Sequence, residues 1–330
     1  MLAAYINETG PPEVIQYGEV PDPVAAADQV LIRVKAVAIN PVDTYIRAGA
    51  NYWELPEPFI IGCDFAGVIE RVGEGVRRFQ PGDRVWGTNQ GLQGRQGTFA
   101  EYCVVDSQWV YPIPDVVEFD TVAASALVGV TAHLGLFREA RIEPDQKLFV
   151  QGGSGGVGSM VIQMAKIAGA KVMASAGSDE KAAVCRELGA DAVANYNSTD
   201  LAAEIAAFAP EGVNVFWETQ REPDFDFIVP TMAERGRIVL MAGRDARPSF
   251  PVGPFYVKEC SLHGFVMFKA TANEMLQSAE DMNRWFEQGK LVPRIDQVFP
   301  LSEAAKGHQM QYQSTVEQSG AVSGKIVLHP

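Results

Sequence analysis

Cysteine is scarce in this sequence, and the few cysteines lie far apart. The 330 residues contain four of them, Cys63, Cys103, Cys185 and Cys260. No two show the C-x-x-C spacing of a redox or zinc motif, and a chain of this length does not need disulfide bonds to build a stable core. We therefore expect four free thiols in a reducing compartment, the cytoplasm.

Positive charge and long apolar runs are scarce as well. Lys and Arg number 27 against 41 Asp and Glu, which gives a formal net charge of −14. Such an acidic surface repels a phosphate backbone, although a few local donors can still hold a phosphorylated cofactor. An uninterrupted apolar run of about 18 residues, which a membrane helix needs, is missing, and residues 1–10 lack an export signal. We expect neither membrane nor nucleic-acid partners.

Two composition patterns divide the chain, whose length suits two domains. Residues 1–121 carry short strand-like runs broken by glycine and proline, which is typical of an all-β barrel. Residues 122–268 alternate strands with helices of about ten to fifteen residues, which is typical of a parallel sheet. A helix and two strands in 269–330 return the chain to the first domain. The clearest early runs are 29–37, 64–72 and 97–105.

The second pattern predicts a dinucleotide-binding fold. After a strand at 148–150, apolar residues at 157, 160, 161, 164, 165 and 168 follow one face of a helix, and Gly169 is placed to end it. Ser178 is typical of the N-cap of the next helix. Six strands with helical crossovers predict the doubly wound parallel sheet of a Rossmann α/β fold. The expected strands are 148–150, 171–175, 192–196, 213–217, 237–241 and 262–268.

The strongest local motif is G-x-G-x-x-G, formed by Gly153, Gly155 and Gly158. It follows a strand and opens a helix, which is the context in which the motif binds a pyrophosphate. Glycine lets the backbone approach the phosphates, and the helix N-terminus offers N–H groups and a positive dipole end. The alternative is a tight turn that binds no ligand. The predicted cofactor contacts are Gly153, Ser154, Gly155, Gly156, Val157 and Gly158.

The end of the second strand indicates which dinucleotide binds. NAD-binding folds usually place Asp or Glu about 20 residues past the glycines, where it holds the ribose 2′-hydroxyl. Here that position is Ser178, in the small-residue stretch Ser-Ala-Gly-Ser. This stretch leaves room for a 2′-phosphate, and a lysine follows within one helical turn. We therefore predict NADPH, held by Ser175, Gly177, Ser178 and Lys181.

Two features qualify that prediction. Asp179 and Glu180 lie between the serine and the lysine, and they must point outward for a phosphate to bind. Lys181 has the alternative role of a solvated surface side chain.

Several ordered motifs resemble those of a known family. Residues 40–49 (NPVDTYIRAG) are similar to the N-x-x-D-x-Y-x-R-x-G segment of quinone oxidoreductases and zeta-crystallins, which are zinc-free medium-chain reductases. The resemblance implies a GroES-like β-barrel catalytic domain, 1–121 with the return segment 269–330, and a Rossmann NADP-binding domain, 122–268. Further matches follow in order at 62–68, 73–76, 81–85, 97–102, 128–132 and 324–327.

The family's zinc-dependent relatives differ at the ligand positions. They would have Cys at Asn40, His-Glu at Cys63-Asp64 and a further Cys near Leu127, together with a four-cysteine lobe. Zinc needs three or four converging N, S or O ligands, so we expect no metal site. The four histidines, His133, His263, His308 and His329, are too dispersed to suggest one.

Without a metal, hydrogen-bond donors must polarise the substrate carbonyl. Asn40, Tyr45 and Tyr52 are the candidate catalytic residues, because the resemblance puts this segment beside the nicotinamide. An amide or phenol can steady a developing oxyanion, and a tyrosine can deliver a proton. Water could supply the proton instead, and Tyr52 could simply pack against the barrel.

The resemblance also implies further cofactor contacts. Tyr196 would lie by the adenine, and Lys325 would reach back toward the cleft. The match weakens at residues 218–220 and at Arg244, which leaves the substrate pocket open. Contacts along the nicotinamide half would come from Pro41, Asp43, Thr131, Ala242, Gly243 and Phe265.

The resemblance implies that NADPH reduces a quinone. The same site could reduce an α,β-unsaturated ketone or aldehyde, because both acceptors take hydride at a conjugated electrophilic carbon. A crystallin-like or RNA-binding role is a third possibility; the charge of −14 counts against RNA. The apolar strand 262–268 ends the predicted sheet, and an exposed edge of this kind predicts a homodimer.

Overall fold

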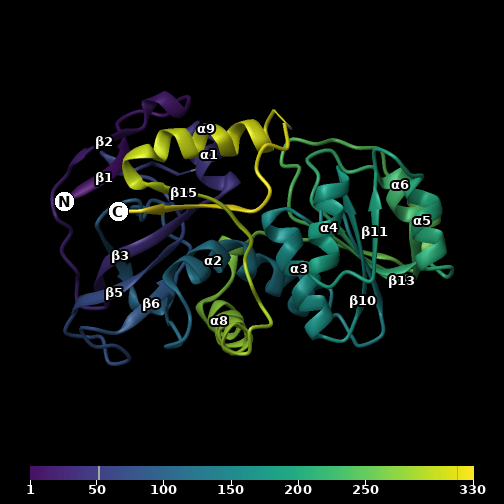
Figure 1. Ribbon diagram of the computed structural model, residues 1–330, viewed down its shortest axis with the longest axis horizontal. Helices are drawn as coiled ribbons and strands as arrows, with labels where there is room; N and C mark the ends of the chain where they lie inside the picture. The colour runs from purple at the N-terminus through teal and green to yellow at the C-terminus, as the bar shows by residue number, and fades with distance from the viewer. Residues whose placement is uncertain (51–52, 318) are drawn as a thin grey trace. The chain divides into compact units, whose positions relative to one another are not determined.

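The computed structural model describes residues 1–50, 53–317 and 319–330, and it divides into two compact units (Figure 1). The first unit comprises residues 1–128 and 270–330, and the second comprises residues 129–269. The sequence placed the first border at residue 121, which lies inside helix α2 (Phe119–His133). A composition change cannot locate a border inside a continuous helix.

The first unit is built on two sheets. One has the order β2-β1-β4, and the larger one has the order β15-β16-β3-β5-β6-β8, with β7 also paired to β3. Strand β3 alternates buried and exposed residues over its first half and is buried over its last four residues, so it passes from the sheet surface into the core. The strands of the first unit are β1 (Leu2–Ile6), β2 (Gln16–Glu19), β3 (Gln29–Ile39), β4 (Phe59–Ile60), β5 (Phe65–Val72), β6 (Arg84–Gly87), β7 (Tyr102–Asp106), β8 (Val110–Pro112), β15 (Ile295–Pro300) and β16 (Lys325–His329).

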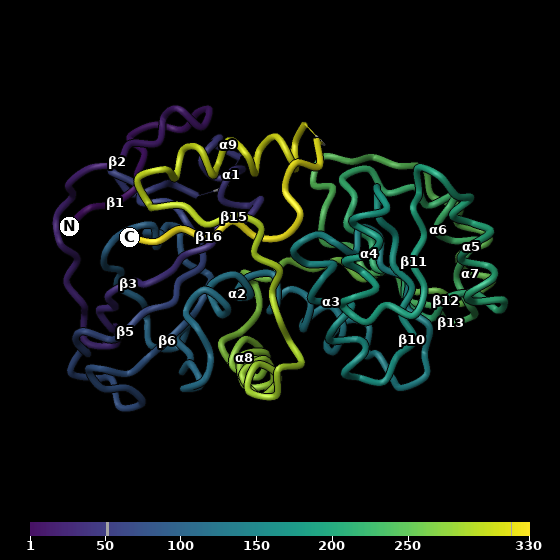
Figure 2. Tube along the Cα trace, viewed as in Figure 1, coloured from purple at the N-terminus to yellow at the C-terminus, as the bar shows by residue number. Residues whose placement is uncertain are grey.

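Helices and the return segment complete this unit. Helix α1 (Pro41–Arg47) directly follows β3, and an all-β reading of the early chain did not include it. The last segment of the chain is part of this unit: α8 (Ala272–Glu287), β15, α9 (Ala304–Thr315) and β16 belong to it. Strand β16 pairs antiparallel with β3, Ile326 opposite Ile39, and α9 packs against α1 (Figure 2). This register brings Lys325 beside the end of β3.

The second unit is the predicted parallel sheet. Its order is β11-β10-β9-β12-β13-β14, and every neighbouring pair is parallel. The strands are β9 (Lys147–Val150), β10 (Lys171–Ala176), β11 (Ala192–Asn195), β12 (Val213–Glu218), β13 (Met232–Leu240) and β14 (Ser261–Gly264). The helices are α3 (Gly156–Ile167), α4 (Asp179–Glu187), α5 (Leu201–Phe208), α6 (Phe225–Thr231) and α7 (Val252–Val257).

The strand order reverses at β9. From β9 the chain moves to β10 and β11 on one side, and later to β12, β13 and β14 on the other. In sheets of this kind, ligands bind beyond the carboxyl ends of the strands at the reversal point. The glycine motif follows β9, so it lies at this point.

Two predicted strands are shorter than expected. The run 97–105 forms a strand only as β7, because residues 97–101 form loop contacts such as the bond from Gly97 N to Ile60 O, 2.8 Å. The run 262–268 ends at Gly264 as β14 and continues as a 3₁₀ turn, Met267–Lys269. An apolar run alone does not distinguish a strand from a buried turn.

One helical segment, Phe119–Glu139, is long and apolar enough to meet the length and composition of a membrane span. Of its most apolar window, 78% is buried inside the protein, which is the property of a core helix. The sequence analysis did not identify this segment, because it considered only uninterrupted apolar runs.

Candidate functional site

The glycine loop after β9 is held by its own packing. Gly152 has a φ of +72°, a region that favours glycine. A Cβ on Gly153 would lie 2.7 Å from the Ala174 Cβ, and one on Gly158 would lie 2.3 Å from the Gly152 carbonyl oxygen. These positions are therefore glycine because the protein itself leaves no space for a side chain.

Gly155 differs from these neighbours. Its φ of −73° and ψ of 170° suit any residue, and an added Cβ would meet only the Gly152 oxygen, at 3.4 Å. Neither strain nor packing explains a glycine here. Gly155 is also the N-cap of α3, where it has no side chain to accept bonds from the first-turn N–H groups. A ligand anion that approaches this backbone would explain both features, so the loop fits a dinucleotide pyrophosphate.

Ser175 stabilises the glycine loop. Its Oγ accepts a hydrogen bond from Gly152 N, 3.2 Å, and its carbonyl oxygen accepts one from Gly153 N, 2.9 Å. The side chain is fully buried. Ser175 thus supports the loop, and its predicted role as a phosphate donor stays a prediction. The sequence pattern could not separate the two roles, because both need a small hydroxyl residue.

The residues beyond β10 lead into helix α4, and their predicted cofactor contacts stay predictions. Ser178 is the N-cap of α4, and its Oγ accepts from Lys181 N, 3.2 Å, which leaves its hydroxyl hydrogen available to another acceptor. Gly177 lies under Tyr196, because an added Cβ would be 2.4 Å from the Tyr196 Oη. Tyr196 is 47% exposed. Gly177, Ser178, Lys181 and Tyr196 thus gather at the ends of two neighbouring strands.

A buried carboxyl group lies at the end of β12, and sequence reasoning did not assign it a role. Glu218 Oε1 accepts from Gln220 N, 2.5 Å, and the next residue, Thr219, donates from Oγ1 to Gln151 O, 2.7 Å. Burial raises the pKa of Glu218 to about 7. The Thr219 bond therefore ties the end of β12 to the start of the glycine loop, and the Glu218 bond stays within the turn after β12. The only sequence signal was the weak family match at 218–220.

The remaining predicted contacts of the second unit have mixed surroundings. Gly243 has a φ of +81° and packs against the Arg221 carbonyl oxygen, while Ala242 is exposed. Phe265 packs edge-on against Trp217 with ring centroids 6.3 Å apart. Thr131 is buried in α2. Their cofactor contacts stay predictions.

In the first unit, Asn40 lies at the centre of a buried polar cluster. Its backbone N–H donates to Asp43 Oδ2, 2.7 Å, which starts helix α1. Its Nδ2 donates to Asp64 Oδ2, 2.8 Å, and to Ala38 O, 3.3 Å. The residue is fully buried, so both amide hydrogens serve the fold. Asn40 was predicted as a donor to the substrate; here it positions α1.

Lys325 completes this cluster. Its Nζ donates to Ile39 O, 2.7 Å, and to Asn40 Oδ1. The side chain is buried against β3, and its predicted cofactor contact stays a prediction. Burial lowers the pKa of Lys325, and the carboxylates of Asp64 and Asp43 oppose that shift.

Two buried carboxyl groups share this one ammonium. Burial raises the pKa of Asp43 to about 7, an effect that the hydrogen bond with Cys63 opposes. Burial raises the pKa of Asp64 as well, against the attraction of Lys325. Asp43 Oδ2 is bonded within the cluster, and the predicted contact of Asp43 with the cofactor stays a prediction.

The other predicted site residues of this segment are Pro41, Tyr45 and Tyr52. Tyr45 and Pro41 are half-buried on α1, and Tyr45 O accepts from Ala50 N, 2.9 Å. Tyr52 lies outside the described residues. The catalytic roles of both tyrosines stay predictions.

Metal donors are not assembled in the described parts of the chain. Among residues 1–50, 53–317 and 319–330, no group of three His, Cys, Asp or Glu could hold a metal ion. Cys63 and Asp64, at the positions of His and Glu in zinc-dependent relatives, lie instead with Asp43 and Lys325.

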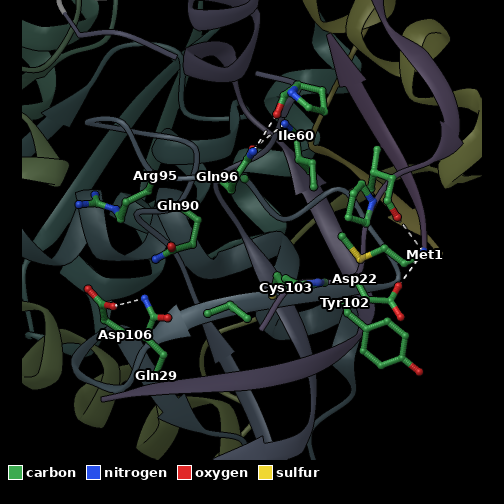
Figure 3. A pocket seen from close by; sticks show the side chains of 16 residues that line it. Met1, Asp22, Gln29, Ile60, Gln90, Arg95, Gln96, Tyr102, Cys103 and Asp106 are labelled. Atoms are coloured by element: carbon green, nitrogen blue, oxygen red, sulfur yellow. Dashed lines mark hydrogen bonds and ion pairs between the residues drawn. The ribbon is translucent and has the colours of Figure 1, made fainter. Parts of the chain in front are cut away.

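A separate hollow of about 490 Å³ opens beside the N-terminal segment of the first unit (Figure 3). Polar side chains on its wall bond to the protein. Gln29 Nε2 donates to Asp106 Oδ1, 2.8 Å, and Gln96 bonds Pro58 O and Ile60 N, 2.7 and 2.8 Å. These groups are engaged in the fold, so the candidate cofactor site is assigned to the glycine loop of the second unit.

Comparison with known proteins agrees with this arrangement. The alcohol dehydrogenase GroES-like domain family matches residues 26–115, and the zinc-binding dehydrogenase family matches residues 156–282. The quinone oxidoreductase of Rattus norvegicus is 32% identical over 99% of this chain and 97% of its own length.

Solved structures extend the likeness to the whole fold. An NAD-dependent alcohol dehydrogenase has a TM-score of 0.90 at 30% identity, with 100% of both chains covered. The Escherichia coli quinone oxidoreductase in complex with NADPH has a TM-score of 0.86 at 25% identity, again with 100% of both chains covered. The GroES-like unit and the Rossmann unit are thereby confirmed. The chain is an oxidoreductase of the medium-chain dehydrogenase/reductase superfamily and belongs to its quinone oxidoreductase family.

Proposed function

We propose that this protein is a zinc-independent, NADPH-dependent quinone oxidoreductase. The observation that supports the cofactor site concerns Gly155, the N-cap of α3. Neither packing nor backbone strain requires a glycine at this position. The preference for NADPH follows from the end of β10, where Gly177 and Ser178 stand in place of an acidic residue. The likeness to an NAD-dependent alcohol dehydrogenase makes this preference the point to test.

The residues of this chain bind and orient the reactants. NADPH, when bound, supplies a hydride, and a quinone accepts that hydride with one proton to become a hydroquinone. The first-turn N–H groups of α3 would hold the pyrophosphate. Ser178 and Lys181 would bind the 2′-phosphate, with Tyr196 beside the adenine. Tyr45 or Tyr52 would donate to the acceptor oxygen, and water is the alternative proton source.

An enone or alkenal acceptor is the second candidate for the same site. It takes hydride at a conjugated carbon, as a quinone does, and needs the same donor at its oxygen. A steady-state assay with NADPH and a panel of quinones and enones separates the two. Higher kcat/KM for the quinones supports the proposal, and turnover of enones alone contradicts it.

Lys181→Ala tests the cofactor preference. One exposed charge pair with the phosphate should contribute about 5- to 30-fold in affinity. We expect the KM for NADPH to rise by that factor while the KM for NADH stays unchanged. Equal effects on both, or a wild type that prefers NADH, would show that the β10 end was misread.

An RNA-binding or lens-protein role is the remaining alternative. With a net charge of −14, we expect no salt-sensitive retention of RNA. A cytoplasmic location is part of the proposal: the free state of Cys63, Cys103, Cys185 and Cys260 fits a reducing compartment. We also propose a homodimer formed through β14, the strand at the edge of the parallel sheet.

A further inference from the structure

The turn after β11 is folded over the end of β10. Ala176 and Asn195 are opposite each other in the parallel pair, and Tyr196 N donates to Ala176 O, 3.1 Å. Asn197 Nδ2 donates to Gly177 O, 2.8 Å. The turn therefore covers the short stretch at which a 2′-hydroxyl or a 2′-phosphate would be distinguished.

Within this turn the Asn195 side chain has a determined orientation. Its Oδ1 accepts from Asn197 N, 3.1 Å, so that end of the amide must be the oxygen. The other end is then the nitrogen, and Nδ2 donates to Asp179 Oδ1, 2.8 Å. The backbone of Asn195 is also held, because its carbonyl oxygen accepts from Ser198 N and Thr199 N, each 3.0 Å.

Asp179 is the acidic residue that could spoil a phosphate site. It is the first residue of α4, directly after the N-cap Ser178. A carboxylate turned toward the ribose would accept from a 2′-hydroxyl and repel a 2′-phosphate, so its direction influences which cofactor binds. In the structure this carboxylate is turned toward β11, where it is bonded to Asn195.

We propose that Asn195 is a specificity-determining residue for the cofactor. It holds the Asp179 carboxylate by a hydrogen bond at the end of β11, and its amide dipole offsets part of the carboxylate charge. This role rests on the proposed use of NADPH. It explains how a strand end with an adjacent acidic residue can still accept a phosphorylated ribose.

The test measures the ratio of the dissociation constants for NADH and NADPH, by nicotinamide fluorescence. In Asn195→Ala the Asp179 carboxylate is released, and we expect this ratio to fall roughly three- to tenfold, mainly through weaker NADPH binding. The fall should diminish at high salt, because exposed charges are screened. The double variant Asn195→Ala with Asp179→Asn should recover the wild-type ratio.

A matched control keeps the turn but spares the carboxylate. Ser198→Ala removes a 3.3 Å bond from Ser198 Oγ to Asn195 O and leaves Asp179 bonded. We expect it to keep the wild-type ratio. Equal weakening of both cofactors by Asn195→Ala would indicate a structural role and contradict the proposal.

The remaining outcomes separate this inference from the proposed function. A wild type that prefers NADPH, with an unchanged ratio in Asn195→Ala, would contradict the role of Asn195 alone. A reduced ratio that Asp179→Asn does not restore would contradict the route through Asp179. A wild type without preference for NADPH would contradict the proposed cofactor, and the role of Asn195 with it.

Discussion

The ammonium of Lys325 donates hydrogen bonds to Asn40 Oδ1 and to Ile39 O, and it thereby joins the last strand of the chain to the start of α1, 285 residues earlier. Asp43 and Asp64 depend on the same ammonium for charge compensation. The C-terminal segment therefore holds the helix that carries Tyr45.

Lys325→Met should destabilise the protein. Removing one partner of a buried ion cluster leaves the carboxylates uncompensated, at a cost of about 3–5 kcal/mol. Urea denaturation measures the loss. Adding Asp64→Asn should restore part of the lost stability, because it removes one of the two buried negative charges that the ammonium compensates. Lys306→Met, which breaks the exposed pair with Glu303 and a cation–π contact with Phe299, is the control and should change stability by less than about 1 kcal/mol. Equal effects of the two lysine substitutions would refute the role of the cluster.

Gly155→Ala and Gly153→Ala should have opposite consequences. An alanine at 155 meets only an oxygen at 3.4 Å, so the fold should lose no more than about 1 kcal/mol, the cost of a poorer N-cap. Its Cβ would occupy the space of the pyrophosphate, so NADPH affinity should fall at least about tenfold. An alanine at 153 would clash at 2.7 Å and should cost about 1–3 kcal/mol of stability. Unchanged NADPH binding in Gly155→Ala would mean that the loop does not hold phosphates.

Glu218 should make stability depend on pH. Burial raises its pKa to about 7 from an ordinary value of 4.5, so between these values the folded protein holds a proton that the unfolded chain has released. The unfolding free energy should therefore fall as pH rises from about 4.5 to 7, by roughly 3 kcal/mol for this group. Denaturation at pH 5 and pH 7.5 measures the slope. Glu218→Gln keeps the acceptor for Gln220 N and should reduce the dependence of stability on pH. The remaining slope comes from Asp43, whose pKa is also raised to about 7. A slope identical to that of the wild type would rule out a titrating Glu218.

The proposed dimer should depend on β14. Leu262 is 40% exposed on this edge strand, next to the end of the sheet. A lysine at an exposed edge opposes pairing with a second copy, so Leu262→Lys should shift the protein toward a monomer of 35.8 kDa in light scattering. Val24→Lys, at an 88% exposed position of the other unit, should leave the wild-type mass. A monomeric wild type at micromolar concentration would exclude the dimer.

Turnover should not require a metal. The positions that bind zinc in related dehydrogenases carry Asn40, Cys63 and Leu127, and the first two belong to the Lys325 cluster. Purified protein should contain well below one zinc per chain, and a chelator should leave kcat unchanged. Stoichiometric zinc with chelator-sensitive turnover would overturn this.

Local patterns in the sequence were sufficient for the Rossmann unit. The glycine motif, the 3.6-residue period of α3 and the N-cap Ser178 involve residues only a few positions apart, so their physical meaning can be read along the chain. The cofactor roles of Gly177, Ser178, Lys181 and Tyr196 stay predictions. The ends of β7 and β14 were misjudged, because an apolar run has no local signal for where pairing stops.

Only the tertiary structure decided which of these polar groups are bonded within the fold. Ser175 matched the pattern of a phosphate donor, yet the glycine loop folds back onto it and buries it. Asn40 and Lys325 matched family positions near the cofactor, yet the antiparallel register of β16 on β3 brings them into contact with each other. A side chain's hydrogen-bond partner depends on which distant segment packs against it. The pairing of β16 with β3 depends on the apolar side chains that both strands bury together. It therefore cannot be read from a short stretch of either strand alone.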